Sequence, residues 1–299
     1  ALGCGSTTSI TISVPKLASA GTISATAADL ILCPGDTLSA DIDGDGTSGG
    51  ASATLDGSVG AIAYQWQISY DNGGSYQDIV GATDADLASA DLGTISQTVN
   101  IHRLAYAMNA GVECAELASN AIQITLDDTR NLAITSSTGG FSFCENDPVT
   151  FTAVGAVNGD TYEWEILSGA TTSTSTGTVA GATTTDTTIV ANGSVKLTIT
   201  TAAGCSYDIT EPITVVAVPA ATVSASATTV CNNDTVSLTA SPAGQATYTF
   251  RLGGVIQQTG ASRTFTSAAL VTTTLYTVEV VNALGCGSTT SITISVPKL

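Results

Sequence analysis

The chain has 299 residues, of which 43% are hydrophobic and 11% charged, and its net charge is −18 because 25 acidic residues face seven basic ones. So acidic a chain lacks the basic surface that phosphate binding needs, which excludes nucleic acid as a partner and disfavours an anionic membrane surface. No stretch approaches the roughly 18 unbroken apolar residues of a membrane span, and the abundance of Thr, Val, Ser and Gly favours an all-β fold.

The chain begins with a sequence that it repeats at its end. Residues 1–17 read ALGCGSTTSITISVPKL, and residues 283–299 read the same. Identity over this length predicts a tandem array with a period of 282 residues, seen through a window slightly longer than one period; an engineered duplication is the alternative. Residues 1–17 are then the terminal strand of a preceding repeat, and whether they complete their own domain or a neighbouring one is left open.

A weaker repeat divides the period into three units. Each unit starts with Cys-x-x-Asp before a β-run, continues with two aromatic residues at period two, and carries a second Cys before an alternating last strand. Units of about 94 residues are typical of immunoglobulin-like sandwiches. We therefore predict three such domains, in a rod-like array with short junctions, at residues 18–127, 128–217 and 218–299.

The first unit carries an insertion between its Cys motif and its aromatic pair. Asp41, Asp43 and Asp45, followed by Gly46, match positions 1, 3, 5 and 6 of a calcium loop. Position 12, where a bidentate acid is expected, is Ser52. Calcium is therefore one interpretation of this loop, and a solvated acidic loop on an acidic protein is the other.

The remaining motifs of the first unit indicate structure rather than chemistry. Asn72-Gly73 predicts a hairpin turn, and Ala85–Leu92 is the best helix candidate, at one or two turns. His102 lies in an alternating strand and is expected on the surface, since a lone His builds neither a zinc site nor a catalytic triad.

One aromatic position recurs in all three units. Trp66, Trp164 and Phe250 occupy it, which predicts a core residue packed between two sheets, with a ligand-stacking platform as the alternative. Phosphate loops, dinucleotide fingerprints and nucleophile elbows are absent from the sequence, so we expect no enzymatic activity.

The seven cysteines indicate an oxidising compartment. Cys4 is the copy of Cys286, so its partner is expected outside the window. The other six allow two patterns. Pairing within domains joins residues 33 with 114, 144 with 205 and 231 with 286; pairing between domains joins the early Cys of one unit to the late Cys of the next, as in Cys33–Cys205 and Cys144–Cys286. Pairing within domains is the leading interpretation; the second arises because the two positions lie at opposite ends of a sandwich, whereas a disulfide needs Cα atoms within about 7 Å. Free thiols are a third outcome.

The order of these motifs resembles the PKD-like and immunoglobulin-like repeats of giant surface proteins of gliding and predatory marine bacteria, which the type IX route exports. The resemblance covers all three units, and the insertion in the first departs from it. It implies a non-catalytic extracellular protein on the cell surface: a filament or stalk repeat that links a cell to a surface or another cell. We expect its partners to be neighbouring repeats and further chains of a homo-oligomeric filament. A ligand-binding adhesin module that recognises carbohydrate or a partner cell is the alternative function.

Overall fold

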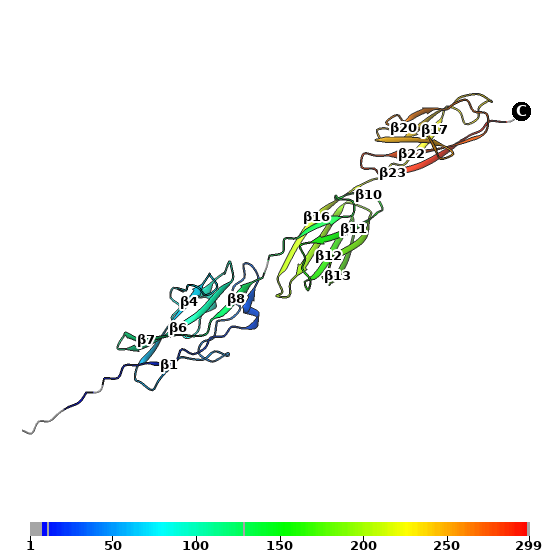
Figure 1. Ribbon diagram of the computed structural model, residues 1–299. Coiled ribbons are helices and arrows are strands. Elements are labelled where there is room, and N and C mark those ends of the chain that lie inside the picture. Colours follow the sequence, from blue (N-terminus) through cyan, green and yellow to red (C-terminus); the bar gives the residue numbers. More distant parts are fainter. Residues whose placement is uncertain (1–7, 11, 128, 298–299) are drawn as a thin grey trace, which may run out of the picture. The chain divides into compact units, whose positions relative to one another are not determined.

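The computed structural model describes residues 8–10, 12–127 and 129–297. The expected all-β, immunoglobulin-like fold is confirmed: short strands in several sheets account for nearly all regular structure, and the described helices are single turns (Figure 1). By contacts the chain divides into two compact units, one of residues 1–130 with 200–206 and one of residues 131–199 with 207–299.

The first unit is a sandwich built on one large sheet. Its order is β2-β8-β6-β4-β5, with β7 also pairing β6, and a small sheet joins β1 to β3. The elements are β1 Leu17–Ser19, η1 Ala27–Leu30, β2 Ile31–Leu32, β3 Thr54–Leu55, β4 Ala61–Ser69, β5 Gln77–Asp78, α1 Ser89–Leu92, β6 Val99–Asn109, β7 Val112–Ala118 and β8 Ile122–Leu126. The helix expected within Ala85–Leu92 is thus the single turn α1.

The second unit holds two hydrophobic cores. The first lies between a five-stranded sheet, β10-β16-β15-β12-β13, and a three-stranded sheet, β14-β11-β9. These elements are β9 Ala133–Ser136, β10 Ser142–Cys144, β11 Asp147–Val154, β12 Thr161–Ser168, β13 Thr171–Thr178, β14 Thr184–Ile189, β15 Gly193–Thr200 and β16 Ser206–Val216.

The second core of this unit lies between the sheets β17-β18-β21 and β20-β19-β22-β23. The elements are β17 Thr222–Ala225, β18 Ser237–Ser241, β19 Thr247–Leu252, β20 Val255–Gly260, β21 Thr264–Thr266, β22 Thr274–Val281 and β23 Gly287–Ile294. Alternation explains the packing: along β22, Tyr276, Val278 and Val280 are buried while the residues between them face outward.

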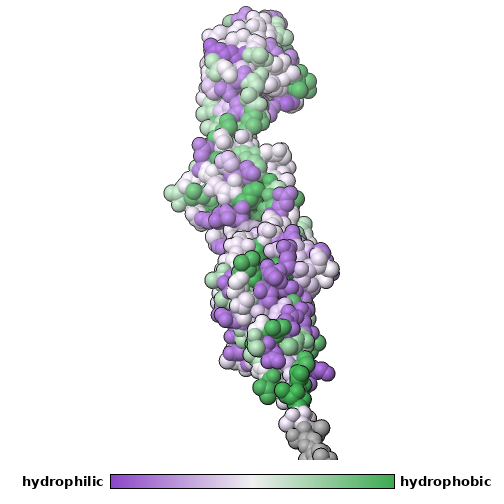
Figure 2. Space-filling model, turned by 90° about the vertical axis from the view of Figure 1, so that its left-hand side faces the viewer, coloured by the Kyte–Doolittle hydropathy of each residue, from purple (hydrophilic) through white to green (hydrophobic). Residues whose placement is uncertain are grey.

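The surface carries many small polar residues with scattered apolar ones. Figure 2 shows polar and apolar side chains mixed over the viewed face, with an apolar patch beside the grey atoms. Among the described residues, no helix has the length and apolar character to cross a membrane.

Candidate functional site: the cysteine turns

The early cysteines open a turn that the sequence encodes locally. Their motif is Cys-x-(Gly/Asn)-Asp, and its third residue has a left-handed backbone in every copy: Gly35 (φ 94°), Asn146 (φ 67°) and Asn233 (φ 73°). Gly adopts this region without steric cost, and Asn tolerates it better than most residues, which explains the choice of residue.

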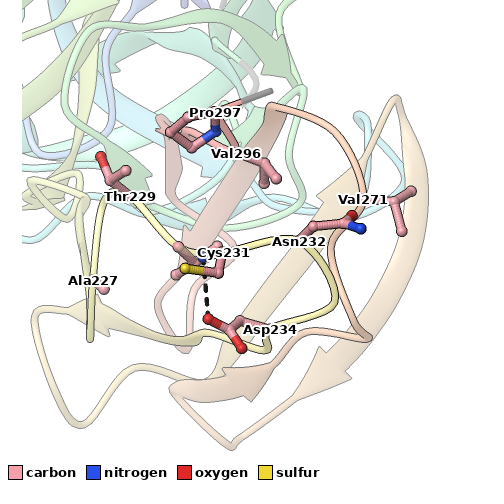
Figure 3. A pocket seen from close by; sticks show the side chains of 9 residues that line it. Ala227, Thr229, Cys231, Asn232, Asp234, Val271, Val296 and Pro297 are labelled. Atoms are coloured by element: carbon pink, nitrogen blue, oxygen red, sulfur yellow. Dashed lines mark hydrogen bonds between the residues drawn. The ribbon is translucent and has the colours of Figure 1, made fainter. Parts of the chain in front are cut away.

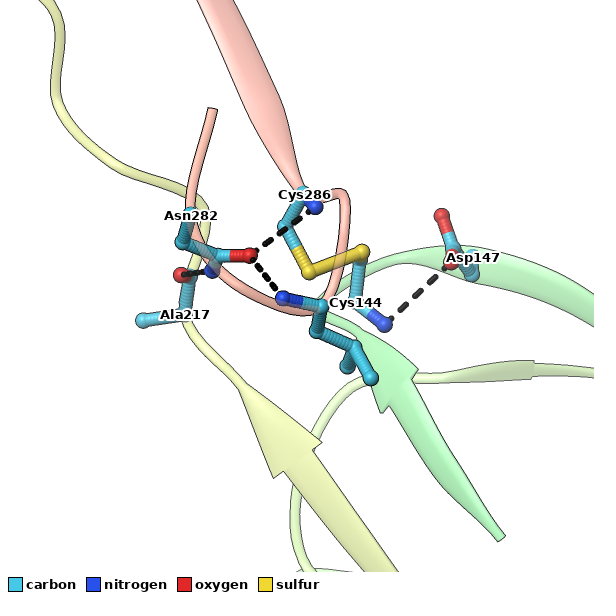
Figure 4. The surroundings of a disulfide bond; sticks show 6 residues. Cys144, Asp147, Ala217, Asn282 and Cys286 are labelled. Atoms are coloured by element: carbon cyan, nitrogen blue, oxygen red, sulfur yellow. Dashed lines mark hydrogen bonds between the residues drawn. A yellow bond between two sulfur atoms is a disulfide. The ribbon is translucent and has the colours of Figure 1, made fainter. Parts of the chain in front are cut away.

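The Asp of the motif caps its own turn. Asp234 Oδ2 accepts a hydrogen bond from the Cys231 N–H at 3.1 Å (Figure 3), and Asp147 Oδ2 accepts one from the Cys144 N–H at 3.2 Å (Figure 4). The backbone N–H of Asp36 donates to the carbonyl of Cys33, as that of Asp234 does to Cys231. Each motif thus forms a turn closed by its Asp, and among the described residues both kinds of bond occur together at Cys231.

Parallel pairing places each early Cys beside the end of the last strand of its own sandwich. β2 pairs in parallel with β8, so that Leu32 lies opposite Leu126, and β10 pairs in parallel with β16, so that Cys144 lies opposite Val216. In the third sandwich a parallel bridge joins Thr229 to Ser295. We call this the downstream end of a sandwich, because the chain leaves the domain there.

The late cysteines lie at the hairpin that joins the last two long strands, at the other end of the sandwich. Cys205 and Cys286 close five-residue turns in which the N–H of Thr201 or Asn282 donates to the Cys carbonyl at 2.9 Å. Asn282 Nδ2 also donates to the carbonyl of Ala217, where the chain arrives at the third sandwich. We call this the upstream end.

The structure joins the early Cys of one sandwich to the late Cys of the next. Disulfides link Cys33 to Cys205 and Cys144 to Cys286, each with Cα atoms 5.4 Å apart. Figure 4 shows the second of these bridges. The within-domain pattern is wrong, and the physical reason is the parallel pairing above: early and late cysteines of one sandwich lie at opposite ends. Cys114 and Cys231 are free and exposed, and Cys4 lies outside the described residues.

The two disulfides close loops that overlap in sequence. The first spans 172 residues and the second 142, and both contain residues 144–205. In the chain-entropy model each loop of this length would stabilise the folded state by about 5 kcal/mol if it acted alone. Because the loops share residues, their contributions are not independent.

The acidic insertion is organised by backbone hydrogen bonds to Asp43. Its Oδ1 accepts from the N–H groups of Asp45 and Gly46, and its Oδ2 accepts from those of Ser48 and Gly50. Burial raises the pKa of Asp43, but these four donors outweigh it and the pKa falls to about 2.

The structure brings two of the three predicted calcium ligands together. Carboxylate oxygens of Asp43, Asp45 and Asp86 lie within 4.8 Å of one another, whereas Asp41 accepts from the N–H of Ser89. Asp86, which the sequence does not indicate, accepts from Gly44 and Asp45. Because the Asp43 oxygens already accept four N–H bonds, this donor set does not fit a calcium ion well, and calcium stays a prediction.

Arg103 forms hydrogen bonds that support the insertion, and the sequence pattern around it does not indicate this role. Its guanidinium is fully buried and donates to the carbonyls of Gly44 (2.7 Å) and Ala85 (2.6 Å), with longer bonds to Ala20 and Ala51. It lies 4.3 Å from the Tyr64 ring centroid, a cation–π distance. A charged residue in the alternating strand 99–104 gives no signal of burial.

The recurrent aromatic residues are core residues, as expected. Trp66, Trp164 and Phe250 are fully buried. His102 is half-buried rather than on the surface: its ring stacks on Tyr76 at 3.8 Å, its Nε2 bonds Gln67, and burial lowers its pKa.

Known proteins resemble parts of this chain. Residues 217–297 match the family described as an Ig-like domain, CHU_C associated, and residues 19–128 match a domain of unknown function (DUF8696). No curated protein matches.

Solved structures that match this chain include three from different proteins. The fibronectin(III)-like modules of Clostridium thermocellum CbhA are 18% identical with a TM-score of 0.35, covering 55% of this chain and 94% of theirs. A structure from a 1.5-MDa bacterial ice-binding adhesin is 15% identical with a TM-score of 0.42, covering 95% and 98%. Murine CEACAM1b is 12% identical with a TM-score of 0.31, covering 56% and 100%.

Proposed function

We propose that the chain is a non-catalytic structural repeat of a giant extracellular filament or appendage stalk, which links a cell mechanically to a surface or to another cell. The observation that carries the proposal is the pair of overlapping inter-domain disulfides, because tension applied to the ends passes through covalent bonds that bypass most of the chain. The match of the third sandwich to an Ig-like family supports a repeat module. Disulfides support an oxidising, extracellular location, and export by the type IX route is part of the proposal.

The bypass can be stated as a length. With both bridges closed, the shortest covalent route runs to Cys33, across to Cys205, back to Cys144 and across to Cys286, about 105 residues in place of 299. At about 3.5 Å per residue, the oxidised chain extends to about 37 nm and the reduced chain to about 105 nm.

Single-molecule stretching of the full chain, before and after reduction with a thiol, tests this proposal. We expect reduction to lengthen the final extension about threefold. An oxidised chain that extends to the reduced length would contradict a role in carrying tension through the bridges.

Lateral assembly into a homo-oligomeric filament belongs to the same proposal. Strand β13 is an eight-residue edge of the five-stranded sheet, its side chains are Thr, Ser and Gly, and it carries no charge. Uncharged edges are available for pairing with another chain. A monodisperse monomer by light scattering at high concentration would count against lateral assembly.

A ligand-binding adhesin is the alternative function. The recurrent aromatic residues that a carbohydrate platform would use are buried in the cores, which weakens this alternative. Binding to a glycan array by the oxidised chain would favour it.

A further inference from the structure

We propose that Cys231 and Cys114 are the two halves of a third inter-domain disulfide, which joins the third sandwich of one repeat to the first sandwich of the next. The inference rests on the proposed tandem array. The two thiols are each of the type that the existing bridges use: Cys231 is an early Cys and Cys114 a late one.

The downstream end of the third sandwich repeats the geometry of the bridged one. At Cys231 and at Cys144 the Asp of the motif caps the Cys N–H. Before Cys144, β10 pairs in parallel with β16, and before Cys231 a single parallel bridge joins Thr229 to Ser295. Beside Cys144 a groove of about 320 Å³ includes Leu284 from the turn that carries Cys286. Beside Cys231 the groove is larger, about 840 Å³, and its lining comes from the third sandwich alone (Figure 3).

The upstream end of the first sandwich carries the matching turn. The hairpin Ala110-Gly111 joins β6 to β7, and Cys114 follows it. This hairpin lies beside Pro15, in the segment that leads into the first sandwich. A Cβ atom at Gly60 would lie 2.8 Å from both the Met108 carbonyl oxygen and the Pro15 ring. Met108 in turn pairs with Glu113, which precedes Cys114. The hairpin that precedes Cys114 therefore lies near Pro15, as the turn that carries Cys286 lies near Ala217.

The exact sequence repeat brings these two ends together. Val14-Pro15 at the upstream end of the first sandwich is identical to Val296-Pro297 at the downstream end of the third, and Val296 and Pro297 line the groove beside Cys231. In a continuous array one copy of this segment serves both ends. It then has Cys231 on one side and the Cys114 hairpin on the other.

The occupant of the groove is the β6–β7 hairpin of the next repeat. Val112, 65% exposed, lies two residues before Cys114, and the groove offers Val230, Val271 and Val296 as apolar partners. Burial of an exposed Val against such residues favours the contact. The next Cys114 follows Cys231 by 165 residues, which lies between the 142 and 172 of the existing bridges.

Formation of the bond requires an oxidant, which we take to be a small or protein disulfide. The Cys231 thiolate attacks it and releases one thiolate; the Cys114 thiolate then attacks the mixed disulfide and releases the second. The protein loses two electrons and two protons, and the oxidant is reduced to two thiols.

A two-period chain, residues 1–282 joined to residues 1–299, tests the inference, with C4S at its start. In the forward variant, C114S in the first period and C231S in the second leave one Cys231 upstream of one Cys114. In the matched reverse variant, C231S in the first period and C114S in the second leave them in the opposite order. Both are oxidised with a glutathione redox buffer and mapped by mass spectrometry without reduction.

We expect the linked Cys231–Cys114 peptide and loss of both free thiols in the forward variant, with both thiols retained in the reverse one. Peptides linking Cys33 to Cys205 and Cys144 to Cys286 report that both variants are folded. Free thiols in a folded forward variant, equal linkage in the two variants, or linkage only between separate chains would each overturn the inference. None of these outcomes bears on the threefold extension that tests the proposed function.

Discussion

The two tryptophans at the recurrent aromatic position differ in how their indole N–H is satisfied. Trp66 Nε1 donates to the Asp84 carbonyl at 3.0 Å, whereas Trp164 Nε1 is buried with no hydrogen-bond partner among the described residues. A buried donor without a partner costs about 1–3 kcal/mol.

We therefore expect W66F to destabilise its sandwich more than W164F does, by about 2 kcal/mol. Both changes remove a similar volume. Only W66F breaks a hydrogen bond, whereas W164F removes a buried N–H donor that has no partner. Hydrogen exchange of the slowest amides, in β6 for the first variant and β15 for the second, measures each free energy. Equal costs would mean that the N–H groups are equivalent in solution.

Arg103 holds several segments together through one planar group. Its two terminal nitrogens reach carbonyls on four separate stretches, among them Gly44 and Ala85. A lysine side chain ends in one ammonium nitrogen, which cannot reach both pairs of carbonyl oxygens. We expect R103K to speed amide exchange across residues 43–51 at least about tenfold, since a lost charged hydrogen bond is worth about 1.5–3 kcal/mol.

R251K is the matched control for this prediction. Arg251 forms a partly exposed ion pair with Glu279 at 3.3 Å, and such pairs contribute little. Unchanged exchange in residues 43–51 of R103K would show that the insertion keeps its structure without the guanidinium.

At the scale of the element, the Asp43 loop links stability to pH. The pKa of Asp43 is about 2 in the folded chain against 3.8 for the free side chain. The ionised form therefore stabilises the loop fully above pH 3.8, and this contribution, on the order of 2 kcal/mol, is lost as the pH falls toward 2.

We expect amide exchange in residues 44–50 to accelerate between pH 4 and 2, after correction for intrinsic rates, and D43N to show fast exchange throughout. D91N, on an exposed residue of α1, serves as the control and should follow the parent chain. A parent chain whose loop is insensitive to acid would place the stabilising bonds elsewhere.

The Asp43 loop also shows what sequence patterns can and cannot predict here. Alternation predicted strands such as β18 and β22, and the Cys-x-(Gly/Asn)-Asp turns follow from local backbone preferences. The loop depends instead on Asp86 and Arg103, which are far away in sequence and become neighbours only through tertiary packing. Cysteine pairing was left with two patterns because parallel pairing of β10 with β16 is a non-local contact.

At the scale of the whole chain, each bridge controls a different part of the extensible length. Because the two loops overlap, opening one bridge does not free the chain. With C33S and C205S together, the remaining bridge leaves a shortest route of about 155 residues; with C144S and C286S together, the route is about 125 residues.

Stretching of the two double variants should therefore give final extensions of about 54 nm and about 44 nm, between about 37 nm for the parent chain and about 105 nm after reduction. This order depends only on which cysteines are joined. Bridges within domains would give a different series of extensions, because each would shorten only one sandwich. The same double variants would then leave single cysteines without a disulfide partner. A reversed order of the two double variants would contradict the overlapping connectivity, whereas the predicted order would show that both bridges share the tension between the ends of the chain.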